Sequence, residues 1–199
     1  MTRGLRALSV LALALWSPEA RVSQVRHETV TLDEVVAQAG CVLRGHLSTP
    51  PSASVAFEVP LVIDGAVVEK PHALGVVNVV IDEVLAGTCH APGTEIRVIS
   101  PDADDTFGLW VEYETIGLSK SPIYFTMEGG FNVWDPGASG QEAIFLLRAA
   151  TPVSTPAGDQ QAAWAAYKAV AEGCQRFVVT GSVVGLGRLA QVKLLLEKR

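Results

Sequence analysis

The densest group of side chains with chemical potential lies between residues 110 and 134. Three carboxylates stand there among four tryptophan and tyrosine residues: Glu112, Glu114, Glu128, Trp110, Tyr113, Tyr124 and Trp134. Paired carboxylates beside aromatic rings are typical of glycosidases and of sugar-binding faces. Alternation with apolar residues, however, predicts that Glu112 and Glu114 lie on the solvated face of a strand. Because tryptophan and tyrosine are enriched at recognition sites, we expect the four aromatic residues to form a partner-binding surface. The alternative is that Trp110 and Trp134 are packing residues.

The other residues that could bind a metal are dispersed. The four histidines, His27, His46, His72 and His90, form no His-x-x-x-His or His-x-His pair, which zinc sites commonly contain. The group Asp102, Asp104 and Asp105 lacks the glycine turn and the distal glutamate of a calcium loop. We therefore expect a solvated acidic loop and no metal site.

Two glycine-containing motifs resemble sites of cofactor or acyl chemistry. Gly185-x-Gly187-x-x-Ala190 matches part of a dinucleotide-binding fingerprint, but such a βαβ unit needs about 30 residues and an acidic residue about 20 positions on. The residues after Gly185 do not supply these features, so we expect a glycine-rich turn and no cofactor. Gly137-Ala-Ser139-Gly140 is one residue short of the Gly-x-Ser-x-Gly nucleophile motif.

Composition and the N-terminal residues point to an exported protein. The chain has 199 residues, of which 49% are hydrophobic, and a net charge of −6. That charge argues against a nucleic-acid partner. Arg3 and Arg6 precede an apolar run over residues 7–16, the pattern of a secretory signal. The run is too short to span a membrane. We expect a signal peptide over residues 1–20, export to the periplasm or the medium, and no later membrane span; the alternative is a buried N-terminal helix.

Three cysteines in an exported chain allow at most one internal disulfide. Cys89 and Cys174 stand beside loop residues, so we expect them to form the bridge. Cys41 opens an apolar strand and is expected to be a buried thiol. The alternative is that all three cysteines are reduced and buried.

Hydrophobic periodicity predicts a mostly β chain. A capping box from Thr31 to Glu34 begins a short helix, and an acidic loop is expected over 101–106. Strands with no helix between them favour a barrel or a sandwich. The expected strands are 41–47, 55–62, 74–85, 95–100, 109–116, 123–127 and 144–149, with a turn at Asp64-Gly65.

The composition changes after residue 150. Residues 151–158 form a proline-containing connector, and Asp159 is expected to cap a helix that ends near Gly173. Trp164, Tyr167 and Ala171 share one stripe of that helix, which we expect to pack against the barrel. Residues 176–184 are strand-like, and residues 189–197 fit either a strand or a helix. The expected domains are a signal peptide (1–20), a β-barrel (21–150) and a C-terminal helix and strand-like segment packed on it (151–199).

Four short motifs carry a resemblance to known proteins: 42–45 (VLRG), 79–87 (VVIDEVLAG), 93–98 (GTEIRV) and 144–148 (IFLLR). With these motifs the chain resembles a loosely defined group of uncharacterised exported bacterial proteins. It is similar to the small Greek-key barrel of OB-like and netrin-like (TIMP-like) modules, and the resemblance implies such a barrel with ligands bound on its faces and loops. Netrin-like inhibitors use an N-terminal cysteine to bind a protease metal, and this chain has no cysteine near the expected mature N-terminus.

We expect an exported, non-enzymatic module that binds a protein or glycan partner through Trp110, Tyr113, Tyr124 and Trp134. One alternative is a netrin-like protease-inhibitor module. Another is a hydrolase that depends on the carboxylates of Glu112 and Glu114.

Overall fold

The computed structural model describes residues 27–48, 54–117, 124–131, 133, 140–149 and 158–199. The expected signal peptide (1–20), the aromatic residue Trp134 and most of the expected connector (151–157) lie outside these ranges. The described helices and strands, in chain order, are β1 (His27–Val30), α1 (Leu32–Gln38), β2 (Cys41–Leu47), β3 (Ser54–Ile63), β4 (Ala66–Gly87), β5 (Glu95–Ile99), α2 (Ala103–Ile116), β6 (Tyr124–Met127), β7 (Glu142–Arg148), α3 (Gln161–Ala171), β8 (Gln175–Phe177), β9 (Val183–Gly185), a 3₁₀ turn (Leu186–Arg188) and α4 (Leu189–Glu197).

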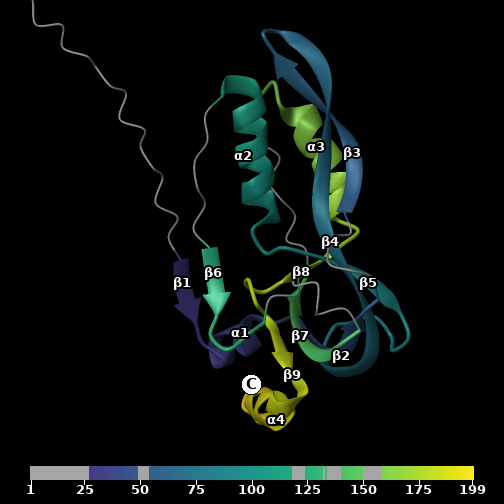
Figure 1. Ribbon diagram of the computed structural model, residues 1–199, viewed down its shortest axis with the longest axis vertical. Coiled ribbons are helices and arrows are strands. Elements are labelled where there is room, and N and C mark those ends of the chain that lie inside the picture. The colour runs from purple at the N-terminus through teal and green to yellow at the C-terminus, as the bar shows by residue number, and fades with distance from the viewer. Residues whose placement is uncertain (1–26, 49–53, 118–123, 132, 134–139, 150–157) are drawn as a thin grey trace, which may run out of the picture.

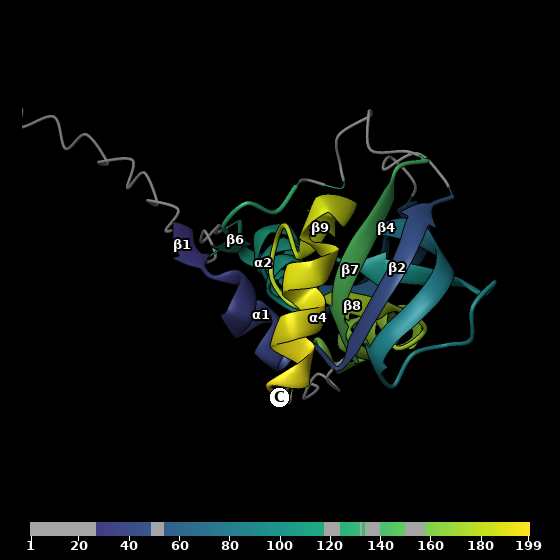
Figure 2. The same ribbon diagram turned by 90° about the horizontal axis from the view of Figure 1, so that it is seen from below.

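The mainly β class is confirmed, and five of the strands pair in a ring. Strand β2 is antiparallel to β4 on one side and to β7 on the other. Strand β4 is antiparallel to β5, β5 is parallel to β8, and β8 is antiparallel to β7. The pairings therefore return to β2, and Figure 2 shows β2 and β7 side by side.

Two C-terminal strands belong to this sheet. The expectation was that residues 151–199 would pack on a barrel formed by residues 21–150 alone. Strand β8 pairs with both β5 and β7, and β9 pairs with β7. The expected single strand over 176–184 is thus two short strands. The inner face of the ring is apolar: alternate residues such as Leu43, Val79 and Phe145 point into one buried cluster with Phe177.

A long hairpin extends from the ring and carries a second layer (Figure 1). Strands β3 and β4 pair from Ser54 to Gly75 around a turn in which Asp64 and Gly65 both have positive φ, 51° and 77°. Such a turn favours Asp-Gly, and the predicted turn is confirmed. The side-chain amide of Gln160 accepts from Val62 N–H at 3.2 Å and donates to Val62 C=O at 2.9 Å. These two hydrogen bonds satisfy the backbone N–H and C=O of Val62 on the outer edge of β3.

Helices α2 and α3 cover the hairpin, and here the expectation for residues 109–116 was wrong. These residues belong to a helix, α2, whose first turn contains the expected acidic loop residues Asp104 and Asp105. Phe107 and Val111, four positions apart, are buried against the hairpin in one cluster with Tyr167 and Ala171 of α3. On α3, Tyr167 and Ala171 of the expected stripe are 0% and 2% exposed and Trp164 is partly buried, and the three pack in this hairpin-layer cluster rather than in the cluster inside the ring.

The remaining helices lie at the other end of the ring. The capping box is confirmed, because the Glu34 carboxylate accepts from the Thr31 backbone N–H at 2.8 Å and from its hydroxyl at 2.7 Å. The ambiguous segment 189–197 is a helix, α4, whose Val192 is buried in one cluster with Val35 and Val36 of α1. Figure 2 shows α4 beside α1 and β7. None of the helices in the described ranges is long and apolar enough to cross a membrane.

The expected bridge between Cys89 and Cys174 is corrected: Cys41 and Cys89 form the disulfide, with a Cα–Cα distance of 5.3 Å. The reason is the register of β2 and β4, which places Cys41 opposite Gly87, two residues before Cys89. Cys174 is a buried free thiol beneath α3, where its Sγ lies 3.6 Å from the carbonyl of Val170.

Candidate functional site

The three described residues of the predicted aromatic surface lie on two different elements, α2 and β6. Trp110 packs in the hairpin layer, with its ring centroid 4.5 Å from that of His72 and 5.6 Å from that of Phe107. Tyr113 is 58% exposed on α2, whereas Tyr124 lies on β6 and Trp134 is outside the described residues. The packing alternative therefore holds for Trp110, and Tyr124 remains as a member of a cavity.

The two carboxylates proposed for hydrolysis do not form a pair. Glu112 and Glu114 stand two positions apart on α2 rather than on a strand, a spacing that directs them to different faces of a helix. Glu114 is bound to Lys70 of β4 at 3.0 Å. The structure thus gives Glu114 a partner in the hairpin layer and leaves the two-carboxylate site without its geometry.

The aromatic cluster around His72 predicts that the stability of the fold depends on pH. Burial lowers the pKa of His72, because its ring packs against Phe57, Phe107 and Trp110. In the unfolded chain His72 takes up a proton below about pH 6.5, but in the folded chain it does so only at lower pH. We expect the free energy of unfolding to fall as the pH drops below about 6.5, and this part of the decline to be absent in His72→Phe. Urea unfolding of both proteins between pH 5 and pH 8 measures the difference; parallel pH profiles would contradict it.

Tyr124 lines a cavity of about 380 Å³, which we call the β6 pocket. One wall is β6, which is parallel to β1 and held from its other side by hydrogen bonds from Met127 N–H to Thr180 C=O (2.9 Å) and from Thr180 N–H to Phe125 C=O (3.0 Å). Asp102 and Asp105 at the start of α2 also line the pocket, as do the apolar Val30, Val178 and Val179. The lining residues are Val30, Gln38, Pro101, Asp102, Asp105, Tyr124, Phe125, Arg148, Val178, Val179 and Thr180.

Groups of both charges face this pocket. Arg148, at the end of β7, donates from Nη2 to the carbonyl of Pro101 at 3.1 Å, while its buried Nε has no hydrogen-bond partner in the described structure. Burial, and then the nearby Arg176, lower the pKa of Arg148. Burial and the Asp102 carboxylate raise the pKa of Tyr124, so its hydroxyl stays protonated at neutral pH. The Ser100 hydroxyl donates to Asp102.

A buried network behind the pocket fixes the start of α2 on the sheet. Arg176 of β8 is 2% exposed and donates from Nη2 to Asp104 Oδ1 at 2.6 Å. The Tyr167 hydroxyl of α3 donates to the same oxygen at 2.7 Å. Burial, and then the hydrogen bond to Asp104, raise the pKa of Tyr167. Because Asp104 lies between Asp102 and Asp105 in the chain, the network also positions the acidic wall of the β6 pocket.

Sequence reasoning found part of this pocket and missed the rest. Tyr124 was expected at a binding surface, and Asp102 and Asp105 were recognised as an acidic group. Gln38, Arg148 and Thr180 were not selected, since they come from three distant segments that only the folded sheet brings together. The one local signal was Arg148, a charged residue that directly follows a five-residue buried stretch of β7.

The described strands form a mainly β protein. Its β6 pocket is lined by aromatic, acidic, amide and guanidinium side chains. No protein-family model matches the chain, and no curated protein matches its sequence.

Proposed function

We propose that the chain is an exported, non-enzymatic module that binds a glycan in the β6 pocket. This proposal rests on the side chains that line the β6 pocket: the rings of Tyr124 and Phe125, the carboxylates of Asp102 and Asp105, and the Arg148 guanidinium. Binding pockets typically combine apolar and aromatic walls with a few polar groups that orient the ligand. A sugar presents apolar C–H faces to rings and hydroxyls to donors and acceptors alike.

The mixture of charges favours a ligand of low net charge. Two carboxylates beside one guanidinium would repel a polyanion, and the net charge of −6 argues in the same direction. Carboxylates accept from sugar hydroxyls, and Arg148 and Gln38 donate to sugar oxygens, so a polyhydroxylated neutral chain uses every group in the pocket. A protein partner would require buried apolar anchors at the centre of its contact. Among the described residues of this pocket, Phe125 is the one strongly exposed ring, at 43%, so the pocket offers a protein a single such anchor.

The strand pairings support an OB-like Greek-key barrel for this module. The ring runs β2–β4–β5–β8–β7 and back to β2, with one parallel pair, β5–β8, and α2 between β5 and β7. OB-like barrels bind oligosaccharides on a strand face and adjoining loops. Export is supported by the Cys41–Cys89 disulfide, because disulfides persist mainly in oxidising compartments.

Replacing Tyr124 tests the pocket directly. Isothermal titration with neutral, acidic and amino-sugar oligosaccharides is expected to find binding to a neutral member of the panel. Tyr124→Ala should weaken that binding at least about tenfold, the equivalent of 1.4 kcal/mol, because the stacking ring is lost. Tyr113→Ala is the matched control, since Tyr113 is an exposed tyrosine outside the pocket, and it should bind as the unmodified protein does.

A second variant keeps the test decisive if Tyr124→Ala unfolds. Gln38 is exposed at the end of α1 and lines the same pocket, so Gln38→Ala should fold normally and bind more weakly. Unchanged affinity in both variants, or a loss in Tyr113→Ala alone, would refute the assignment of the glycan to the β6 pocket.

A further inference from the structure

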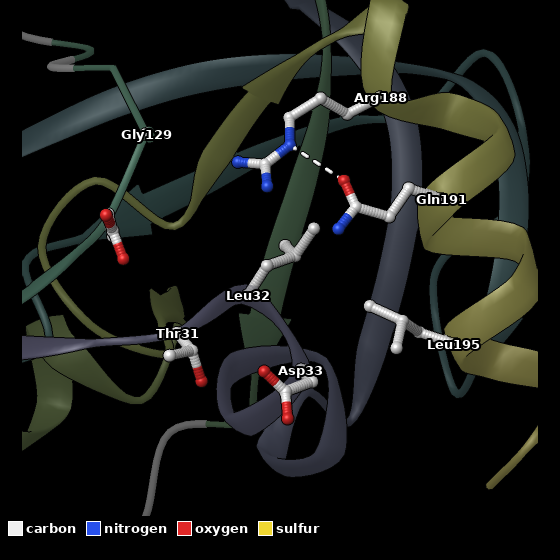
Figure 3. Close-up of a pocket in the computed structure, with 8 residues that line it drawn as sticks. Thr31, Leu32, Asp33, Gly129, Arg188, Gln191 and Leu195 are labelled. Atoms are coloured by element: carbon white, nitrogen blue, oxygen red, sulfur yellow. Dashed lines mark hydrogen bonds between the residues drawn. The ribbon is translucent and has the colours of Figure 1, made fainter.

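A second cavity, of about 560 Å³, opens between α1 and α4; we call it the α1–α4 pocket (Figure 3). Leu32 and Leu195 supply apolar contacts on two sides, and both are shown in the close-up. The polar groups are Asp33 at the start of α1, Glu128 after β6, and Arg188 and Gln191 at the start of α4. None of these residues belongs to the β6 pocket.

Among the described residues, Arg188 makes one side-chain hydrogen bond, which leaves its two terminal nitrogens without a partner there. Its Nε–H donates to Gln191 Oε1 at 3.1 Å, the dashed line in Figure 3. A Cβ built on Gly129 would lie 3.0 Å from Arg188 Nη1, so the guanidinium lies directly against this glycine. Within the described residues, no hydrogen bond or ion pair engages Nη1 or Nη2. The end of the guanidinium that binds carboxylates in a two-pronged contact is therefore available.

The charges elsewhere in the cavity are negative and do not neutralise Arg188. Asp33 and Glu128 are exposed, and neither carboxylate lies within 4.0 Å of the guanidinium as an ion pair. Hydrogen bonding from the Thr31 side chain lowers the pKa of Asp33, which keeps this carboxylate ionised. The pocket thus offers one positive and two negative groups, a pattern that a ligand with one carboxylate and a net positive charge complements.

We propose that the α1–α4 pocket binds a basic amino-acid residue, with its carboxylate on Arg188 and its cationic groups on Asp33 and Glu128. The methylene chain of a lysine or arginine suits the contacts offered by Leu32 and Leu195. A free basic amino acid supplies the carboxylate and two cationic groups, whereas the C-terminal residue of a peptide supplies the carboxylate and the side-chain cation alone. The proposal is independent of glycan binding, since the two cavities share no lining residue.

Three probes separate the required groups. Titration of ¹⁵N-labelled protein with L-lysine is expected to shift the amide signals of α1 and α4. L-Lysinamide, which lacks the carboxylate, should bind at least about tenfold more weakly because Arg188 loses its partner. Gly-Gly-Lys keeps the carboxylate and the side-chain ammonium. Binding equal to that of lysine identifies a peptide terminus as a sufficient ligand, and weaker binding identifies the free amino acid.

Charge-removing variants connect these shifts to the pocket. Arg188→Gln should weaken lysine binding at least about tenfold, whereas Lys193→Gln, an exposed change on α4, should not. Tyr124→Ala should leave lysine binding unchanged, so failure of this site and failure of the glycan site are distinguishable. Equal binding of lysine and lysinamide, no effect of Arg188→Gln, or no shift in α1 and α4 would each overturn the proposal.

Discussion

Asp104→Ala is expected to lower the free energy of unfolding by about 3–5 kcal/mol, because it leaves a buried charge without its partner. Arg176 is 2% exposed, and its Nε and Nη1 already have no hydrogen-bond partner in the described structure. Asp104 is the carboxylate that binds its Nη2, at 2.6 Å. The nearby Arg148 adds like charge, and the hydroxyl of Tyr167 loses its acceptor in the same variant.

Chemical denaturation monitored by tryptophan fluorescence measures this loss. Asp105→Ala is the matched control, since Asp105 is the exposed neighbour in the same turn of α2; we expect a change within about 0.5 kcal/mol. The double variant Asp104→Leu/Arg176→Met should recover much of the lost stability, because apolar replacement of a whole buried ion pair is often neutral. A loss in Asp104→Ala no larger than that of Asp105→Ala would contradict the role given to the network.

The double variant Cys41→Ser/Cys89→Ser is expected to lose about 4 kcal/mol in the chain-entropy description of a disulfide. The bridge spans 48 residues, and removing it releases the unfolded chain from a closed loop of that length. The intact bridge also links the first residue of β2 to the loop after β4. Cys174→Ala is the control, because Cys174 is a free thiol and its replacement opens no loop.

Peptide mapping under non-reducing conditions identifies the bridge independently of stability. The expected result is a linked peptide pair that contains Cys41 and Cys89, with Cys174 alkylated only after unfolding because it is buried. A linked pair that contains Cys174 would contradict the register of β2 and β4 on which the ring depends.

Local sequence signals were sufficient to predict one turn and one helix start. Asp64-Gly65 predicted the turn between β3 and β4, since both residues tolerate positive φ. The strand expected from residue 74 begins at Ala66, directly after this turn. The capping box at Thr31 and Glu34 predicted the start of α1 for a similarly local reason, as both of its hydrogen bonds lie within three residues.

The helix α2 was missed because its local preference and its tertiary contacts disagree. Residues 109–116 are rich in aromatic and β-branched side chains that alternate with glutamates, which favours a strand. The four-residue spacing of Phe107 and Val111 instead places both on one helical face, where they are buried against the hairpin. Burial of that face outweighs the weak local preference.

Pairing of the cysteines and assembly of the β6 pocket depend on contacts that no local pattern encodes. Sequence spacing does not determine which cysteines pair. The β2–β4 register does, because it places Cys41 opposite Gly87, two residues before Cys89. Likewise, Gln38, Tyr124 and Arg148 come from α1, β6 and β7, and they line one pocket because β6 pairs with β1 and with Thr180.

The most direct test of the glycan-binding proposal is the position of the bound ligand. We would record amide shifts of the ¹⁵N-labelled protein during titration with the oligosaccharide that binds best in the calorimetric panel. The proposal predicts that the largest shifts occur at residues around the β6 pocket, including Gln38, Tyr124 and Thr180. Shifts centred on the exposed face of α2 around Tyr113, or no saturable shifts with any oligosaccharide, would contradict it.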